Sequence, residues 1–277
     1  MISIQNLSFS YRKNKPLFEN LNLQLEAGHI YGLLGKNGAG KSSLLKHIAG
    51  LLFPNAGHCK VLGFESRYRQ PAFLQNIFMV PEEFYLPQVS IKSYVSTYAP
   101  FYPLFDKKAF YNYLEEFQIP MDQKLTEMSY GQKKKVLISF ALASNTKALI
   151  LDEPTNGLDI PSKSQFRKVI AAAVSDEKCI VISTHQVRDL DNLIDSIVII
   201  DNHKIIFRQD VETVTDRLLF STVANIADTN KVLFSDSSIR GHAIITPNEG
   251  AQHSRIDMEL LFNAVLDKPE RITQIFN

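Results

Sequence analysis

The residues with the clearest chemical capacity form one short run, GKNGAGKS at residues 35–42, which fits the pattern G-x-x-x-x-G-K-[ST] without a mismatch. Glycines allow backbone N–H groups to come close to phosphate oxygens. At this spacing Lys41 can reach the β- and γ-phosphates of a nucleotide, and the Ser42 hydroxyl can hold Mg²⁺. The residues expected at the nucleotide are Gly35, Asn37, Gly38, Ala39, Gly40, Lys41, Ser42 and Ser43. The alternative is a glycine-rich turn that binds nothing.

The elements that must position this run are predicted on both sides of it. Residues 29–34 (HIYGLL) are typical of a buried strand, and residues 43–51 place apolar side chains at helical spacing. A strand, a glycine loop and a helix N-terminus together form an anion site, because the helix dipole favours negative charge there. The flanks therefore favour phosphate binding over an inert turn.

Two adjacent carboxylates follow a second apolar run. Residues 148–151 (ALIL) are typical of a strand at the centre of a parallel sheet, and Asp152 and Glu153 come directly after them. The carboxyl ends of such strands are where open α/β sheets bind ligands. There Asp152 can hold Mg²⁺ through water, and Glu153 can face the water that attacks a γ-phosphate. A turn that starts a helix is the alternative interpretation.

Composition limits the classes of protein that fit. The 277 residues are 45% hydrophobic, enough for one large domain or one domain with a small appendage. The net charge of +1 gives no global field, so we expect no nucleic-acid partner. Cys59 and Cys179 lie in apolar surroundings and are expected to be reduced core residues. We expect no signal peptide, and no apolar run approaches the ~20 residues that span a bilayer.

A third motif makes a family recognisable. Residues 128–132 (MSYGQ), upstream of the Asp-Glu strand, resemble the Leu-Ser-Gly-Gly-Gln signature of ATP-binding cassette (ABC) ATPases. Four further positions are similar to the family's adenine-stacking aromatic, Q-loop, D-loop and switch histidine, namely Tyr11, Pro81-Glu82, Asn156-Gly157-Leu158-Asp159 and His185. This order of motifs is highly specific, and the resemblance covers roughly residues 1–208.

The resemblance implies roles for these residues. Glu153 and His185 would be catalytic, and Tyr11 would stack on adenine. The residues implied to hold Mg²⁺ are Ser42, Glu82 and Asp152. The signature and D-loop residues implied to contact nucleotide are Ser129, Gly131, Gln132 and Asp159. In this family the signature faces ATP bound to the opposite subunit, which implies a head-to-tail dimer with two ATP molecules.

Simpler interpretations of the same residues stay open. Tyr11 could be a core aromatic, and His185 could cap the next helix. We interpret the charge run 133–135 (KKK) as a solvated face, the usual place for such a run.

Two positions depart from the family pattern. Tyr130 replaces the first glycine of the signature and Met128 replaces its leucine, which could reshape the loop over the γ-phosphate. Glu82 stands where the family usually has glutamine, a substitution that resembles ABC-2-type exporter subunits. A carboxylate there can still bind Mg²⁺ or orient water.

The resemblance implies an α/β fold, a P-loop NTPase cassette with a mostly parallel core sheet, an N-terminal antiparallel β subdomain, an inserted helical subdomain and a small α+β C-terminal extension. We place the ATPase domain at residues 1–208, its helical subdomain at about 83–135, and the extension at 209–277. Residues 84–87 (FYLP) lie where the family presents a groove to its membrane subunit. The elements predicted in the extension are strands at 217–223, 231–235 and 242–246 and a helix at 257–266.

These observations predict an ATP-binding and ATP-hydrolysing subunit of an ABC transporter, with export favoured. Two copies would close on two Mg-ATP and drive separately encoded transmembrane permease subunits, from the cytoplasm at the inner face of the cell membrane. The main alternative is a soluble cassette ATPase acting on ribosomes, DNA or iron–sulfur assembly. A non-hydrolysing ATP-gated module is a second alternative, which Glu153 and His185 disfavour.

Overall fold

A six-stranded sheet lies at the centre of the computed structural model, which describes residues 1–13, 15–190, 192–226, 229, 231–238, 241–250 and 253–276. Its strand order is β10-β9-β3-β8-β7-β6, and β10 at one edge is antiparallel to β9 while the other neighbours are parallel. The strands are β3 (His29–Leu34), β6 (Ile77–Val80), β7 (Ala148–Asp152), β8 (Cys179–Thr184), β9 (Ser196–Asp201) and β10 (Lys204–Asp210). Every residue of β7 and β8 is buried, because both faces of the sheet are covered.

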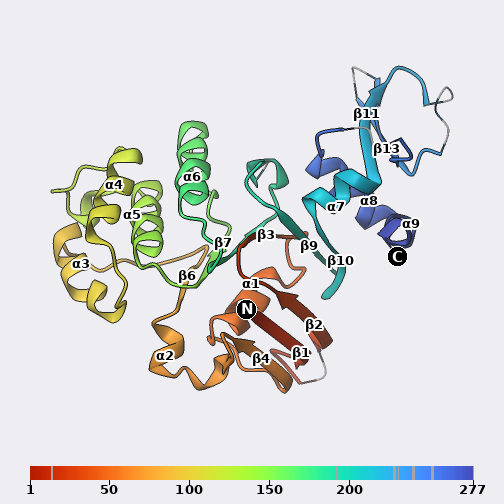
Figure 1. Ribbon diagram of the computed structural model, residues 1–277. Helices are drawn as coiled ribbons and strands as arrows, with labels where there is room; N and C mark the ends of the chain where they lie inside the picture. Colours follow the sequence, from red (N-terminus) through yellow and green to blue (C-terminus); the bar gives the residue numbers. More distant parts are fainter. Residues whose placement is uncertain are drawn as a thin grey trace.

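An antiparallel sheet at the N-terminus covers one side of the core (Figure 1). Its order is β2-β1-β4-β5, and the strands are β1 (Ile2–Phe9), β2 (Phe18–Leu25), β4 (Ala56–Val61) and β5 (Phe64–Glu65). Buried and exposed positions largely alternate along β2, as expected for a strand with one solvent-facing side. The buried face packs with helix α1 (Lys41–Ile48) and with β3 in one hydrophobic cluster that also contains both cysteines.

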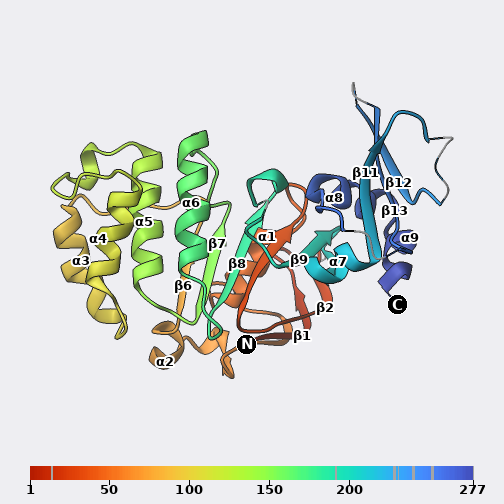
Figure 2. The ribbon, with the colours of Figure 1, turned by 45° about the horizontal axis from the view of Figure 1, so that its top comes forward.

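Helices form a lobe beyond β6, at the opposite end of the molecule from the C-terminus (Figures 1 and 2). Its elements are α3 (Ile91–Tyr98), η2 (Ala99–Phe101), α4 (Lys107–Glu116), η3 (Leu125–Glu127) and α5 (Tyr130–Ala143). Ser90, Asp106 and Ser129 cap α3, α4 and α5 with side-chain hydrogen bonds. The aromatic side chains meet in the core, where Phe140 packs against Tyr94 and Phe110 with ring centroids 5.1 and 6.2 Å apart.

Three further helices connect these parts. They are α2 (Pro71–Leu74), which precedes β6, α6 (Ile160–Ala172) between β7 and β8, and the 3-10 helix η4 (Val187–Leu190) after β8. A short 3-10 helix, η1 (Ser66–Tyr68), follows β5.

The C-terminal part is a small α+β unit at the other end of the molecule (Figure 2). Its elements are α7 (Val211–Arg217), β11 (Leu218–Val223), β12 (Phe234–Ser238), β13 (Gly241–Pro247), α8 (Met258–Asp267), α9 (Pro269–Thr273) and η6 (Gln274–Phe276). The predicted strand at 231–235 is displaced to 234–238, because Phe234 pairs with Ile245 and the antiparallel register runs on to Gly241. The sheet order is β11-β13-β12.

The boundary that we place at residue 208 stays a prediction. β10 continues to Asp210, and the same hydrophobic cluster contains Val187 and Leu190 of the cassette and Leu261 and Val265 of α8. The predicted helical subdomain likewise ends inside α5, which runs on to Ala143. In the described part of the chain, no helix combines the length and apolarity that a membrane span requires.

Candidate functional site

The loop between β3 and α1 bends at positions that only glycine tolerates well. Gly40 has φ of +110°, and a Cβ there would lie 2.9 Å from the ring of Phe18. The loop turns back on itself so that the buried Lys41 ammonium donates to the carbonyl oxygens of Gly35 at 2.7 Å and Lys36 at 3.3 Å. α1 then starts at Lys41, so its free backbone N–H groups lie at the loop.

The predicted carboxylates lie at the carboxyl edge of the same sheet. Glu153 follows β7 with φ of +46°, a left-handed conformation that a non-glycine residue rarely adopts. Its Oε1 lies 3.5 Å from Lys41 Nζ and 2.8 Å from His185 Nδ1. Asp152 pairs in register with Ser183 of β8, whose hydroxyl donates to Asp152 Oδ1 at 2.5 Å. Parallel pairing of β3, β7 and β8 therefore brings together groups from three distant parts of the sequence.

These groups open onto a cavity of about 580 Å³, which we call the P-loop cavity. Its lining residues are Tyr11, Leu17, Asn37, Gly38, Gly40, Lys41, Ser42, Ser43, Glu82, Glu153, Asn156 and His185. Gly35, Ala39 and Asp152 are buried and do not line it. The structure thus brings most of the predicted P-loop, catalytic and Mg²⁺ residues to one place.

Two lining residues were missed as site residues. Asn156 donates from Nδ2 to Glu82 Oε1 at 2.9 Å, and its place in the predicted D-loop was the available signal. Leu17 carries no chemical signal in the sequence.

Tyr11 is 59% exposed, so it is not a core aromatic. Its hydroxyl lies 2.9 Å from Ser43 Oγ, and its ring packs edge-on against Phe9.

The signature residues line a second cavity of about 550 Å³, the signature cavity. Its lining residues are Ser129, Tyr130, Gly131, Gln132, Lys135, Gly157, Leu158, Asp159 and Ser162, none of which lines the P-loop cavity. Ser129 and Gln132 form a capping box at the start of α5, and Asp159 caps α6 through Ser162 N at 3.1 Å. The hydrogen bonds from Ser162 lower the pKa of Asp159. Within one chain, the cavity lined by Ser129, Gly131, Gln132 and Asp159 is therefore separate from the cavity lined by Lys41.

The interpretation of residues 133–135 as a solvated face is wrong for Lys134. This side chain is fully buried, and its ammonium donates to the carbonyl oxygens of Glu153 at 2.9 Å and Asn156 at 3.0 Å. Its neighbours Lys133 and Lys135 are partly buried. The charge pattern alone cannot show this, because it takes no account of the turn that packs over α5.

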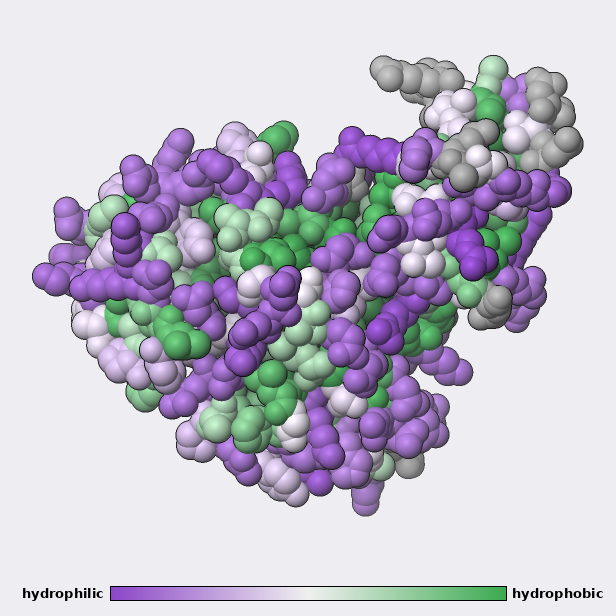
Figure 3. All heavy atoms as spheres, in the orientation of Figure 1, coloured by the Kyte–Doolittle hydropathy of each residue, from purple (hydrophilic) through white to green (hydrophobic). Residues whose placement is uncertain are grey.

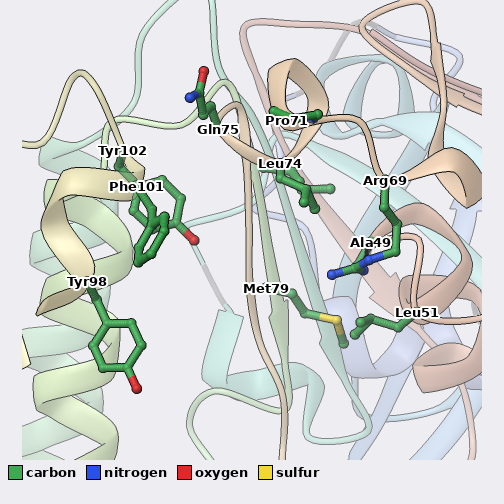
Figure 4. A pocket seen from close by; sticks show the side chains of 11 residues that line it. Ala49, Leu51, Arg69, Pro71, Leu74, Gln75, Met79, Tyr98, Phe101 and Tyr102 are labelled. Carbon is green, nitrogen blue, oxygen red and sulfur yellow. Dashed lines mark hydrogen bonds between the residues drawn. The ribbon is translucent and has the colours of Figure 1, made fainter.

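A third cavity, of about 460 Å³, is an apolar groove between the helical lobe and α2. Figure 4 shows Tyr98, Phe101 and Tyr102 on one side, facing Leu74 and Met79 on the other. Several of its side chains are exposed, among them Phe101 at 65%, and apolar patches interrupt the polar surface drawn in Figure 3. Residues 84–87 do not line this groove: Phe84 stacks on Tyr130 with ring centroids 5.0 Å apart, and Tyr85 is 79% exposed. The docking patch predicted at 84–87 stays a prediction.

Comparison with known proteins shows which family the chain belongs to. A family model described as ABC transporter matches residues 18–156. The chain belongs to this family. It is an ATP-binding and ATP-hydrolysing subunit of an ABC transporter, and the non-transport alternatives find no support in the comparisons.

Three relatives illustrate the range of the ABC family around this chain. The ABC transporter ATP-binding protein NatA of Bacillus subtilis is 30% identical over 224 residues, covering 77% of this chain and 91% of NatA. The Nod factor export ATP-binding protein I of Burkholderia orbicola is 27% identical over 278 residues, covering 98% and 88%. The methionine import ATP-binding protein MetN of Carboxydothermus hydrogenoformans is 33% identical over 235 residues, covering 74% and 65%.

Solved structures show the ABC cassette fold. An ATP-binding subunit of an ABC transporter superposes with a TM-score of 0.69 at 24% identity, covering 77% of this chain and 91% of that chain. A dimeric ATP-binding cassette bound to ADP and Pi superposes with a TM-score of 0.67 at 20% identity, covering 76% and 99%. The α/β cassette fold predicted from the sequence is confirmed.

Proposed function

We propose that this subunit hydrolyses ATP in the P-loop cavity, with Glu153 as the general base for the attacking water. The observation that carries the proposal is the convergence of Lys41 and His185 on Glu153 Oε1, at 3.5 and 2.8 Å. Glu153 would take the proton of the water as the oxygen attacks the γ-phosphate. Lys41 would stabilise the negative charge on the β- and γ-phosphates, and His185 would contact the γ-phosphate.

The oxygen donors in and beside this cavity fit Mg²⁺. Ser42 and Glu82 line the cavity, and Asp152 is buried beside it. Hydroxyl and carboxylate oxygens are the ligands that Mg²⁺ prefers, directly or through water, so we propose that these three residues hold it. When bound, Mg²⁺ would neutralise charge on the phosphates. Tyr11, exposed at the rim, would stack on the adenine.

A second copy of the chain would complete each site. Ser129, Gly131 and Gln132 lie in a cavity separate from their own P-loop, and the start of a helix suits a phosphate. A dimeric cassette that superposes on this chain supports pairing of two copies. We propose a head-to-tail dimer in which the signature cavity of one copy covers the P-loop cavity of the other.

The partner of the apolar groove would be a permease subunit encoded separately, at the inner face of the cell membrane. Exposed aromatic side chains such as Tyr98 and Phe101 suit an apolar or amphipathic segment of that partner. Export is supported by the relatives named for Nod factor export, one of which aligns with 98% of the chain. Glu82 in the Q-loop position supports the same direction.

Two measurements test this proposal together. Phosphate release from ATP by the purified chain should require Mg²⁺ and stop with EDTA. In membranes of cells expressing the chain with its permease partner, Phe101→Ser should reduce the amount that sediments with the membrane. Leu104→Ser is the matched control, since Leu104 is 63% exposed and lies outside the groove lining. Equal sedimentation of both variants would reject the groove as the docking site, and absent Mg²⁺-dependent turnover would reject the ATPase site.

A further inference from the structure

A fully buried lysine, Lys134, lies under the turn that contains Glu153. Lys134 lies on α5, five residues after the signature serine that caps this helix. Burying an ammonium is costly unless it is hydrogen-bonded, and here the compensation comes from two carbonyl oxygens. They belong to Glu153, at 2.9 Å, and Asn156, at 3.0 Å.

These two carbonyl groups are the two ends of one turn. Asn156 N donates to Glu153 O at 3.2 Å, so residues 153–156 close a tight turn directly after β7. The other side of Glu153 is fixed by β8, since Glu153 N donates to Ser183 O at 3.2 Å and Ser183 Oγ at 3.1 Å. Glu153 also has the left-handed φ of +46°, a conformation that persists only when neighbouring contacts hold it. The hydrogen bonds from Lys134 Nζ to the carbonyl oxygens of Glu153 and Asn156 supply such contacts from the side of α5.

The same helix reaches the Q-loop one turn earlier. The Tyr130 hydroxyl donates to the carbonyl oxygen of Glu82, and the Tyr130 ring stacks on Phe84. Lys134 Nζ lies 5.6 Å from the centre of the Tyr130 ring. Asn156 Nδ2 closes the cluster by donating to Glu82 Oε1 at 2.9 Å. Burial lowers the pKa of Lys134, and the carboxylates of Glu82, Glu153 and Asp152 act in the opposite direction.

We propose that Lys134 is a positioning residue that sets the direction of the Glu153 carboxylate from the signature helix α5. The inference rests on the proposed function, in which Glu153 is the general base and Ser129 meets nucleotide on a second copy. Because Ser129 and Lys134 belong to one helix, a shift of α5 at the signature cavity moves the two carbonyl groups that Lys134 holds. Each chain then links the nucleotide at its signature to the base in its own P-loop cavity.

The test compares Lys134→Met with Lys178→Met. Methionine has similar length and no charge, so a buried methionine should pack in place of Lys134. Lys178 is the matched control, because it also donates to a backbone carbonyl, Ala173 O at 3.2 Å, and lies at the other end of β8. For Lys134→Met we expect kcat for ATP to fall by about 10- to 100-fold, with KM and the Kd of a fluorescent ATP analogue within about twofold of wild type. Lys178→Met should leave all three unchanged.

Rescue separates positioning from a general structural effect. Lys134→Arg retains buried donors and should recover part of kcat. Lys134→Gln should have a kcat between those of Lys134→Met and Lys134→Arg. If Lys134→Met does not fold, the Gln and Arg variants carry the test, and a wild-type kcat in Lys134→Gln overturns the proposal. Equal losses in kcat and in nucleotide affinity overturn it too, since they indicate a collapsed site. Wild type and Glu153→Gln are assayed alongside. An inactive wild type, or an active Glu153→Gln, rejects the proposed function, whereas an active wild type with an equally active Lys134→Met rejects only the role of Lys134.

Discussion

The two polar cavities of this chain differ in how far their charged groups are buried and paired with one another. In the P-loop cavity the charged groups are buried and paired, with Lys41 6% and Glu153 4% exposed. The signature cavity lies nearer the surface, with Tyr130 45% exposed, although Leu158 and Ser162 of its lining are buried. The first is assembled by parallel strand pairing inside one chain, and the second by two capped helix starts at the surface. Nucleotide binding should therefore depend on the first cavity even in an isolated chain, whereas the second cavity should matter only when two chains meet.

The largest effect is expected from the general base. Glu153→Gln removes the proton acceptor while keeping the shape of the side chain, so hydrolysis should fall by ~10²–10⁴-fold. ATP binding should persist, because the P-loop is unchanged, and the variant should accumulate as an ATP-bound dimer on size-exclusion chromatography. Glu177→Gln, with an 80% exposed side chain, is the control and should hydrolyse ATP normally. Near-normal turnover in Glu153→Gln would contradict the assignment.

Motifs with fixed local geometry made this half of the site predictable. The strand at 29–34, the loop after it and the carboxylates after 148–151 fall where the sequence placed them, because each is specified by neighbours in the chain. Lys41, Glu153 and His185 then meet because their strands are parallel and in register.

The contacts that sequence reasoning missed depend on packing between distant segments. Nothing in a run of three lysines indicates that Lys134 lies under the turn 153–156, and Asn156 meets Glu82 across 74 positions of sequence. The apolar groove joins residues of α2, β6, α3 and η2 with the segment that follows α1, so no single run of the sequence indicates it. The register of β12 was likewise set by β13 and not by its own composition.

A second variant tests nucleotide affinity in the P-loop cavity. Lys41→Ala removes the cation that meets the β- and γ-phosphates, and a hydrogen bond to a charged group contributes about 1.5–3 kcal/mol. ATP affinity should therefore fall by roughly 10- to 100-fold in a titration with a fluorescent analogue. Lys46→Ala, on the same helix and outside the cavity lining, should bind ATP normally. Unchanged affinity in Lys41→Ala would mean that the nucleotide lies elsewhere.

The signature cavity should respond only in the dimer. Ser129→Arg adds bulk where a second copy is expected, so hydrolysis and ATP-dependent dimer formation should be lost. ATP binding to the single chain should stay nearly unchanged, because Ser129 does not line the P-loop cavity.

Mixing Ser129→Arg with Lys41→Ala chains sharpens this test. A mixed dimer holds one composite site with both lesions and one with neither, so about a quarter of wild-type activity should return if dimers form at random. If the mixture stays inactive, an ATP-dependent crosslink between cysteines placed at position 129 and in the P-loop of a partner distinguishes two causes. Its presence means that the sites act only as a pair, and its absence means that the signature does not face the partner's nucleotide.

The smallest effect at neutral pH is expected for the free energy of unfolding, and it concerns His47 on α1, the helix that follows the P-loop. Its side chain is fully buried beside Phe9 and Phe18, with Nδ1 3.1 Å from Leu52 O, and burial lowers its pKa to about 4. The folded protein keeps His47 neutral down to about pH 4, whereas the unfolded chain takes up a proton below its ordinary pKa of 6.5. From pH 6.5 to 4 the unfolded state therefore binds more protons, and the free energy of unfolding should fall by up to about 3 kcal/mol. Urea unfolding at several pH values measures this loss.

Two variants test whether His47 causes it. His47→Asn retains a donor for Leu52 O and does not titrate, so the free energy of unfolding should depend less on pH between 6.5 and 4. The exposed His253→Asn should show the pH dependence of wild type. Parallel slopes in all three proteins would show that folding does not lower the pKa of His47.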